Sequence, residues 1–422
     1  MDEPQWKKEV SQCVKCGSCL SVCPVYRETG REPLAARGKL SLLADYLSGL
    51  LPGDQEIYHL LSNCLLCGAC AENCPSGVAA DELIQKGRSL FLEKTGAAQW
   101  KKFLAGQLLP HPKRIRKLSK GQGFLFKKIP EERGVRLRFF KDSRIWPELA
   151  DPFFLDRKAP AAPRPRTPSR RIGYFVGCMT NYLYPEIGRA VQKLLSPMGE
   201  VVIPQNQTCC GLPAFALGDI KTARELARQN ILAFKEEKVE AVVVSCSSCA
   251  AHLKLTYPQL LAGETTIRDE ATDFTRKVRE LSQFLVSSKK GFDCERKAAD
   301  PGQEKVLRIL FHDPCHAKRK LHLAGEPRML LASRPGLALV EPEVQQCCGH
   351  GGLFHLSHPD LSQKILERPS GAFDQPGIDV ITTSCLACLM QFKEGVLRSG
   401  KKVLVKHWAE LMTKKAGARA KK

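Results

Sequence analysis

Cysteines are the residues of this sequence most able to do chemistry, because eighteen of the 19 fall into four ordered groups. Thiolates are soft ligands that select soft metals, and several of them at regular spacing suit a core of iron and sulfide. The pattern therefore indicates metal clusters that carry electrons. The groups are Cys13, Cys16, Cys19 and Cys23; Cys64, Cys67, Cys70 and Cys74; Cys178, Cys209, Cys210, Cys246 and Cys249; and Cys315, Cys347, Cys348, Cys385 and Cys388.

The first two groups share the spacing C-x2-C-x2-C-x3-C-P, which is typical of bacterial ferredoxins with two clusters. Three thiolates of one loop converge on one cubane, and the fourth cysteine, followed by Pro24 or Pro75, points to the other cluster. Gly17 and Gly68 stand where the backbone passes close to sulfide. This rule predicts two cubane [4Fe-4S] clusters with crossed ligands. The first takes Cys13, Cys16, Cys19 and Cys74, and the second takes Cys64, Cys67, Cys70 and Cys23.

Zinc and disulfides are the alternative explanations of these cysteines. Zinc sites usually use two cysteine pairs separated by a longer loop, which differs from the spacing of this sequence. Disulfides require an oxidising compartment, and the first residues, MDEPQWKKEV, lack the apolar segment of a signal peptide. We therefore expect reduced cysteines and a cytoplasmic protein, either free or peripheral on the membrane.

The last two groups belong to an internal repeat, in which residues from about 170 to 290 align with residues from about 305 to 412. Each unit has a cysteine after an apolar run, then a CCG triplet, then a C-x2-C pair after a second apolar run. Such runs are typical of strands buried in a parallel sheet. The stretch between Ala223 and Phe234 has apolar residues at helical spacing and predicts a covering helix.

These patterns predict an α/β protein in which a helical two-cluster ferredoxin domain precedes two repeated α/β CCG domains with short parallel sheets. Right-handed crossovers would bring all the strand-borne cysteines to the carboxyl ends of the strands. The predicted divisions are a ferredoxin-type domain at 1–95, a basic, proline-rich linker at 96–169, CCG domains at 170–290 and 304–412, and a basic tail at 413–422. The segment VKHWAEL, which contains His407, predicts an amphipathic C-terminal helix.

The chain resembles a known family through these motifs. The CCG units look like the cysteine-rich domains of the heterodisulfide reductase family. The whole order resembles the iron-sulfur subunit of bacterial glycolate oxidase and the related subunits of lactate and anaerobic glycerol-3-phosphate dehydrogenases. The segment LAARGKLSLL is similar to that family's proline-arginine-glycine-arginine segment, with Ala36 in place of the usual proline. CPSGV, CCGLPAF and HDPCH are also similar to the family.

The resemblance implies an electron-transferring subunit that works beside an FAD-containing dehydrogenase subunit. That partner would oxidise glycolate or lactate, and electrons would pass toward a quinone. The resemblance also implies two further [4Fe-4S] clusters at the CCG units, of the noncubane type in the best-understood examples. No Rossmann fingerprint occurs in the sequence, so we expect neither flavin nor NAD in this chain.

Three alternatives remain open at this point. Because both CCG units keep all five cysteines, their clusters could themselves reduce a disulfide or a quinone, as in heterodisulfide reductase. The partner could instead be a glycerol-3-phosphate dehydrogenase. Finally, the CCG units could be scaffolds with zinc or no metal.

The net charge of +21 is concentrated partly between residues 101 and 145, where lysines and arginines alternate with phenylalanines. This stretch could be a solvated linker or could dock on a partner or on anionic lipids. We expect no nucleic-acid binding, because no nucleic-acid motif accompanies the charge. His312, His316 and His350 lie near the cysteines, either as structural donors or to tune a cluster potential. Cys294 is predicted to be an exposed bystander.

Crossed ligation makes a specific prediction for Cys74. Replacement of Cys74 by Ser should damage the cluster held by Cys13, Cys16 and Cys19 and leave the other cubane largely intact. Electron paramagnetic resonance of the two reduced clusters measures this directly. A variant that loses only the cluster of Cys64 would contradict the crossed assignment.

Overall fold

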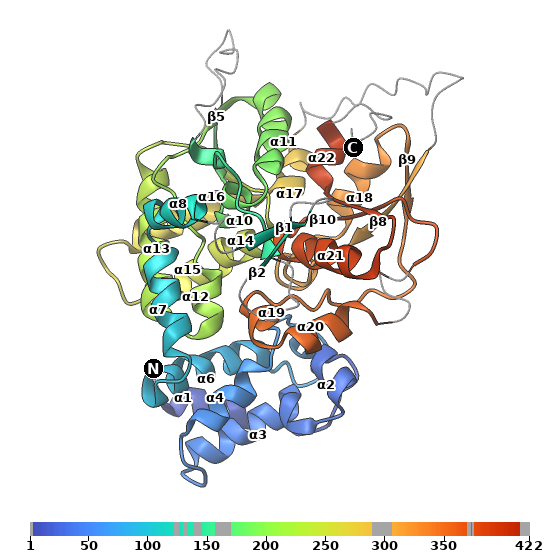
Figure 1. The fold of residues 1–422 in the computed structure, drawn as a ribbon. Coiled ribbons are helices and arrows are strands. Elements are labelled where there is room, and N and C mark those ends of the chain that lie inside the picture. Colours follow the sequence, from blue (N-terminus) through green and yellow to red (C-terminus); the bar gives the residue numbers. More distant parts are fainter. Residues whose placement is uncertain are drawn as a thin grey trace.

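The computed structural model describes residues 3–121, 126–129, 134–137, 146–156, 170–288, 306–368, 373 and 375–413. A helical N-terminal part, blue in Figure 1, lies below two α/β parts, which are green to yellow and orange to red. The predicted fold class is confirmed, because each α/β part contains a four-stranded sheet. Among the described residues, no helix is both long and apolar enough to span a bilayer.

The N-terminal part is a bundle of short helices around the two ferredoxin motifs. Leu43, Leu61 and Phe91 are fully buried in its core. Asp54 caps one helix by accepting a hydrogen bond from the backbone nitrogen of Ile57, at 3.0 Å. The helices are α1 (Glu3–Ser11), α2 (Pro24–Thr29), α3 (Ala36–Leu47), α4 (Gln55–Ser62), α5 (Ala69–Glu72) and α6 (Ala80–Thr95).

Regular elements also occur in the stretch that the sequence suggested as a linker. Helices α7 (Gln99–Leu108) and α8 (Pro112–Lys120) precede an antiparallel sheet of β1 (Phe126–Ile129), β2 (Gly134–Leu137) and β3 (Trp146–Pro147). The basic residues between the short strands, the proline-rich spacer, Cys294 with its surrounding segment, and the basic tail lie outside the described residues. The predicted domain boundaries therefore stay predictions.

The first α/β part has a parallel sheet with the strand order β5-β4-β6-β7. The covering helix predicted around Ala223 is confirmed as α13. The elements are β4 (Arg171–Phe175), α10 (Cys178–Tyr182), α11 (Pro185–Leu195), β5 (Glu200–Val202), α12 (Leu212–Leu217), α13 (Ile220–Lys235), β6 (Ala241–Val244), α14 (Ser247–Ala251), α15 (Tyr257–Leu261), α16 (Arg268–Lys277), β7 (Val278–Glu280) and α17 (Leu281–Ser287).

The second α/β part repeats this topology, with the strand order β9-β8-β10-β11. In both units the second and third strands lie on opposite sides of the first strand. The direction in which strands are added to the sheet therefore reverses between the second strand and the third. Ligand sites of parallel sheets form at the carboxyl ends of such strands. The elements are β8 (Leu307–His312), α18 (Gly325–Ala332), β9 (Leu337–Val340), α19 (Leu353–Ser357), α20 (Pro359–Leu366), β10 (Val380–Thr383), α21 (Leu386–Ser399), β11 (Leu404–His407) and α22 (Trp408–Thr413).

The C-terminal segment corrects one prediction. His407 lies on strand β11, which pairs with β10, and only the residues from Trp408 onward are helical. The run Leu404–His407 can complete the parallel sheet at its edge, and this tertiary pairing overrides the helical pattern read from the sequence.

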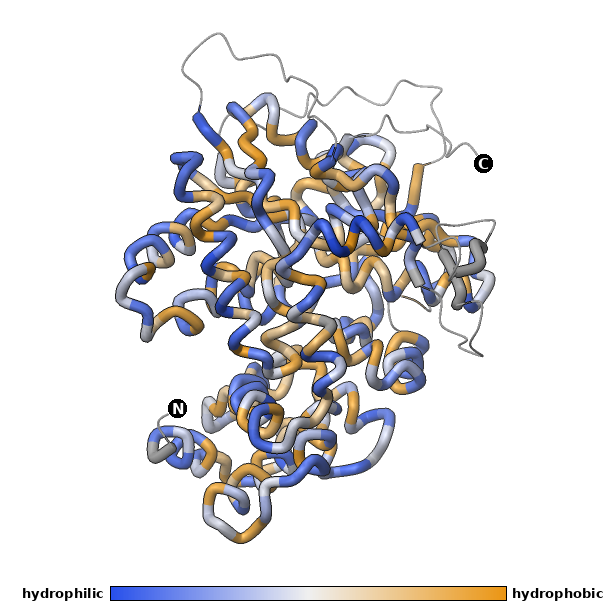
Figure 2. The backbone as a smooth tube through the Cα atoms, turned by 60° about the vertical axis from the view of Figure 1, so that its left-hand side comes forward, coloured by the Kyte–Doolittle hydropathy of each residue, from blue (hydrophilic) through white to orange (hydrophobic). Residues whose placement is uncertain are grey.

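The three parts pack into one body. The two α/β parts share a hydrophobic core, in which α11 packs on α22 and α17 on α18. The helical part contacts both of them: the Tyr58 hydroxyl donates to the Leu217 carbonyl oxygen at 3.0 Å, and Leu65 packs in one cluster with Phe354. Figure 2 shows hydrophilic segments on many outer turns and hydrophobic segments running through the interior. This packing fixes the ferredoxin motifs against the repeated units.

Glu280 is a buried carboxyl group in this core region, with 2% of its surface exposed. It caps α17 by accepting hydrogen bonds from the backbone nitrogens of Ser282, at 2.7 Å, and Gln283, at 3.3 Å. Burial raises the pKa of Glu280 to about 7. The folded protein therefore holds this proton more tightly than the unfolded chain.

The free energy of unfolding should consequently fall as the pH rises from about 4.5, the ordinary pKa of the group, to about 7, and then level off. The contribution is on the order of 3 kcal/mol. Glu280→Gln should flatten this dependence in anaerobic urea unfolding at pH 5 and pH 8. Glu200→Gln, at a side chain that is 53% exposed, serves as the control. An unchanged slope in Glu280→Gln would contradict the assignment.

Candidate metal centres

The second ferredoxin motif and the last cysteine of the first motif surround one small cavity of about 20 Å³. Its lining includes Cys64, Cys67 and Cys70 together with Cys23. Cys23 caps α2, and its sulfur accepts a hydrogen bond from the backbone nitrogen of Tyr26 at 3.5 Å. The four thiols thus converge from two loops as the crossed pattern requires. A set of four cysteines is the usual donor set of a [4Fe-4S] cluster.

The other ferredoxin cysteines also draw together. Cys13 and Cys16 are near enough to Cys19 for their charges to raise its pKa, although burial is the larger cause. The end of the second motif approaches this loop through Asn73, whose Nδ2 donates to the Ser18 carbonyl oxygen at 2.8 Å. Cys74 follows directly in the chain. The geometry is consistent with Cys74 as the fourth donor here.

Gly17 has a specific role in this loop. Its φ of +87° is unfavourable for other residues, and a Cβ atom would lie 3.1 Å from the Arg37 guanidinium. Arg37 in turn donates from Nη1 to the Lys15 carbonyl oxygen at 3.1 Å. Gly17 therefore lets the loop close around its cysteines.

Two buried cations stand beside the second set of thiols. Lys39 is 1% exposed, lines the small cavity and donates to the carbonyl oxygens of Leu34 and Asn63. Arg88 is 5% exposed and donates to the Cys64 carbonyl oxygen at 2.5 Å and to that of Leu61 at 2.8 Å. Among the described residues, no ion pair joins a carboxylate to either cation.

Buried charge is costly unless an opposite charge compensates it. Burial lowers the pKa of Lys39, whereas Cys64 and Cys23 oppose that shift. An iron-sulfur cluster with four thiolate ligands is an anion and would supply the missing counter-charge. The donor set and its surrounding charge therefore both fit such a cluster.

In the first CCG unit, five cysteines come from three segments at the carboxyl ends of β4 and β6. Cys178 starts α10, and Cys246 is the N-cap of α14. The CCG triplet precedes α12, with Gly211 at a φ of +90°. Cys209 lies close enough to Cys178 to raise its pKa together with burial, whereas Cys209 and Cys249 lower the pKa of Cys210. Metal binding would be needed to hold all five of these crowded sulfurs as thiolates.

The second CCG unit repeats this arrangement. Cys385 is the N-cap of α21, and the sulfurs of Cys348 and Cys388 are 3.1 Å apart. A hydrogen bond to Cys347, together with burial, raises the pKa of Cys315. The structure thus brings together all five predicted cysteines of each unit, a donor set that suits iron and sulfide.

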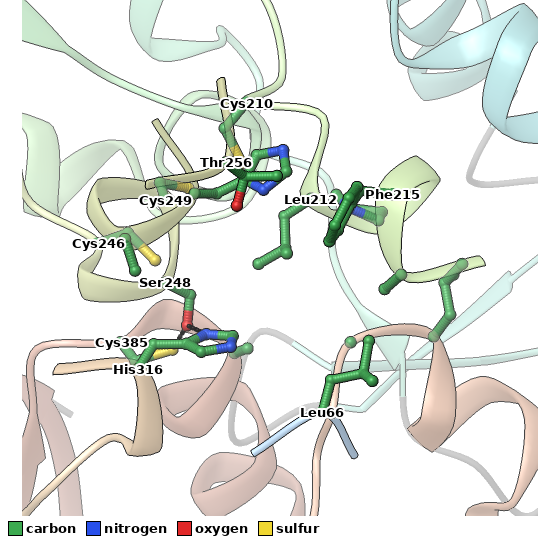
Figure 3. Close-up of a pocket in the computed structure, with 18 of the residues that line it drawn as sticks. Leu66, Cys210, Leu212, Phe215, Cys246, Ser248, Cys249, Thr256, His316 and Cys385 are labelled. Carbon is green, nitrogen blue, oxygen red and sulfur yellow. Dashed lines mark hydrogen bonds between the residues drawn. The ribbon is translucent and has the colours of Figure 1, made fainter. Parts of the chain in front are cut away.

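The two CCG sites adjoin each other. The Ser248 hydroxyl of the first unit lies 3.1 Å from the sulfur of Cys385 in the second, and 3.0 Å from Nδ1 of His316. The thiol of Cys385 also lies close to that of Cys246, because Cys249 lowers the pKa of Cys246 whereas Cys385 and burial raise it. Figure 3 shows Cys246, Ser248, Cys385 and His316 on one side of a cavity. Only a few side chains therefore separate the two sites.

The second CCG unit also adjoins the ferredoxin part. The thiols of Cys67 and Cys347 lie close enough for Cys347, together with burial, to raise the pKa of Cys67. Arg319 and Lys320, which follow Cys315 in the chain, form interface ion pairs with Glu72 at 2.8 Å and Asp81 at 2.8 Å. Asp81 is 4% exposed, so its pair with Lys320 is shielded from solvent. The ion pairs hold the second ferredoxin site against the second CCG unit.

A cavity of about 960 Å³ lies where the three parts meet, and nine of the ten CCG cysteines line it. Leu66 and Phe215 lie across the cavity from Ser248 and Cys385 (Figure 3). Its wall is mostly apolar, with a few polar groups such as His252, which is 2% exposed. The space is thus the one in which the clusters of both CCG sets would lie, together with any small molecule bound beside them.

The chain matches two known domain types and several known proteins. Residues 9–78 match the 4Fe-4S dicluster domain, and residues 172–254 and 309–393 match the cysteine-rich domain. The probable glycolate oxidase iron-sulfur subunit of Bacillus subtilis is 30% identical over 97% of this chain and 94% of its own length. This chain belongs to the glycolate oxidase iron-sulfur subunit family.

Other relatives of this chain carry names that refer to different reactions. A fumarate reductase (CoM/CoB) subunit of Methanothermobacter marburgensis is 26% identical over 94% of this chain and 71% of its own length. Lactate utilization protein A of Geobacillus kaustophilus is 34% identical over 57% of this chain and 98% of its own length. The resemblance stated from the sequence is confirmed, and the matched domains support iron-sulfur clusters in this chain.

Sequence reasoning missed the two cations and Ser248. Two signals were available, since Lys39 is part of the family-like segment LAARGKLSLL and Ser248 lies inside the C-x2-C pair of Cys246 and Cys249, whereas nothing near Arg88 marked it. His316 contacts Ser248, and His350 accepts a hydrogen bond from the Gly352 backbone nitrogen at 3.1 Å. His350 is buried and His316 is partly buried, and desolvation lowers the pKa of both.

Lys39→Met should lower the reduction potential of the cluster that Cys23, Cys64, Cys67 and Cys70 would hold, because one compensating positive charge is lost. We expect roughly a tenfold lower ratio of reduced to oxidised cluster at a fixed potential, which corresponds to about 59 mV for one electron. Potentiometric titration followed by electron paramagnetic resonance measures it. Lys86→Met is the control, since Lys86 is 38% exposed and pairs with Glu9 at the surface. Equal potentials in both variants would contradict this role of Lys39.

Proposed function

We propose that this chain is the electron-transferring iron-sulfur subunit of a flavin-dependent 2-hydroxy acid dehydrogenase. The observation that carries the proposal is the unbroken series of cysteine sites. Cys67 of the ferredoxin part contacts Cys347, and Cys385 contacts Cys246 of the first CCG unit. Such spacing suits the transfer of single electrons, which bound iron-sulfur clusters would supply.

Ligand residues follow from the same contacts and stay part of the proposal. Two cubane clusters would be held by the crossed ferredoxin sets, and two further [4Fe-4S] clusters by the CCG sets. The chain's own residues would position the sulfurs, exclude water from them and balance their charge through Lys39 and Arg88. The domain interface would keep the sites in the order first cubane, second cubane, second CCG unit and first CCG unit.

The names of two relatives support the substrate class. One relative is a probable glycolate oxidase subunit and another is a lactate utilization protein, and both names refer to 2-hydroxy acids. The hydride chemistry would take place on FAD in a partner subunit, and a quinone would be the final acceptor. A peripheral position on the cytoplasmic face of the membrane would suit that acceptor.

A second candidate function is reduction of a small organic acceptor, a disulfide or a quinone, at the CCG sites themselves. The cavity of about 960 Å³ favours it, because nine of the ten CCG cysteines line this space and a small acceptor bound there would lie directly beside the clusters. The name of the Methanothermobacter relative, a fumarate reductase (CoM/CoB) subunit, agrees with a reductase role.

The proposal predicts about sixteen irons per anaerobically purified chain, and about eight if the CCG sets hold no cluster. With the flavoprotein partner bound, glycolate or lactate should bleach the iron-sulfur absorbance. Cys347→Ser, at the domain contact, should slow bleaching of the CCG signals and leave cubane reduction intact. Cys294→Ser is the matched control, because Cys294 lies outside all motifs.

Two results would overturn the proposal. One is a reduced flavin with fully oxidised clusters after addition of substrate. The other is reduction by glycerol-3-phosphate and by neither hydroxy acid. Bleaching that is reversed by a disulfide without any quinone would favour the second candidate.

A further inference from the structure

The two CCG units differ at one position directly beside their metal sites. The residue three positions before the first cysteine is Phe175 in the first unit and His312 in the second. Both residues end the first strand of their sheets, and they pair with corresponding residues, Val244 and Thr383. The repeat therefore offers a direct comparison between a phenyl ring and an imidazole ring in the same place.

His312 is surrounded by the second CCG site. It is 2% exposed, and its ring lies edge-on against Phe392 with a centroid separation of 4.9 Å. A ring nitrogen of His312 and the sulfurs of Cys348 and Cys388 all lie within 4.8 Å of one another. A single metal atom could contact all three atoms after small movements. Imidazole and thiolate together are a common donor set for iron and zinc.

Phe175 cannot bind metal and is part of the first unit's apolar core. It is fully buried, and its ring lies 6.1 Å from that of Phe234, measured between centroids. Among the described residues, no histidine forms a comparable group with two cysteines of the first unit.

We propose that His312 is a nitrogen ligand of the metal centre in the second CCG unit, alongside Cys348 and Cys388. The second site would then offer five thiolates and one imidazole, whereas the first offers five thiolates only. The two centres would be chemically unequal despite the repeated fold. The inference rests on the proposed function only in requiring that metal occupies the second CCG site.

A neutral imidazole changes the electronic character of a centre. In Rieske clusters histidine replaces thiolate, and the potential rises because less negative charge surrounds the iron. Here the imidazole would add to the five thiolates without replacing one, so it changes the ligand field and not the net charge. The second CCG centre should therefore differ from the first in its spectrum and in its potential.

The test uses whole protein labelled with ¹⁵N-histidine, purified anaerobically and reduced to a state in which the CCG centre is paramagnetic. Pulsed electron paramagnetic resonance should detect a nitrogen coupling of the strength found for directly bound imidazole. His312→Phe recreates the residue of the first unit and should abolish this coupling. The other nine histidines, among them His316 and His350, remain in that variant, so any coupling left belongs to one of those.

His312→Phe should also shift the potential of the second centre, and a tenfold change in the ratio of reduced to oxidised centre at a fixed potential corresponds to about 59 mV for one electron. His312→Gln provides a second variant if the phenyl ring prevents folding. The reciprocal Phe175→His should not change the second centre and controls for general effects of these substitutions. Iron content per chain confirms that the centre is still present.

Two outcomes would overturn the inference. A weak nitrogen coupling would show that His312 only donates a hydrogen bond to sulfur. Equal spectra and potentials in the wild type and His312→Phe would show that it is a packing residue. Neither outcome depends on the partner or the substrate, so both are distinguishable from failure of the proposed function.

Discussion

The structure depends on one constraint, which is that its buried cysteine sulfurs need metal or cationic groups beside them to be stable as thiolates. Eighteen cysteines lie in four sets whose thiols approach one another, and most are wholly or partly buried. Burial raises the pKa of a thiol, so ionised sulfur is stable there only beside metal or cationic groups. The helices and sheets serve to bring these sets to common points. The fold is thus best understood as a support for metal ligands.

The supporting cations show how the same constraint shapes the polar interior. Lys39 and Arg88 are buried without a carboxylate partner among the described residues, next to thiols that would be anionic with metal bound. Isolated in a dry interior, such cations would destabilise the fold. Beside an anionic cluster, they would stabilise both the cluster and the fold. Cluster binding and folding are therefore expected to be coupled in the N-terminal part.

The repeated units combine a shared topology with different surroundings. Both sheets have the same strand order, and each delivers five cysteines from the same three positions. Both units line the large cavity, but the second meets the ferredoxin part through ion pairs of Arg319 and Lys320, whereas the first accepts a hydrogen bond from Tyr58 at Leu217. The histidine in place of Phe175 adds to this difference. The repeat thus provides two sites of one topology, and the residues that surround the two sites differ.

The sequence alone determined the four sets of cysteines, the two ferredoxin loops, the repeat and the parallel α/β character. These features depend on short spacings and on local periodicity, both of which a linear chain displays directly. It did not determine that the run ending at His407 becomes an edge strand, because that depends on pairing with β10. Nor did it determine the contact between Cys67 and Cys347.

Only the tertiary structure decided which sites adjoin and what surrounds them. The neighbours of Cys385 include Ser248, which is far away in the sequence, and the cation beside Cys23 and Cys64 is Lys39. Such contacts arise when separate domains pack through shared apolar cores, and no local pattern encodes the relative placement of those surfaces. The cysteine sets were therefore predictable from the chain, whereas their order in space and their surroundings depended on how its three parts pack.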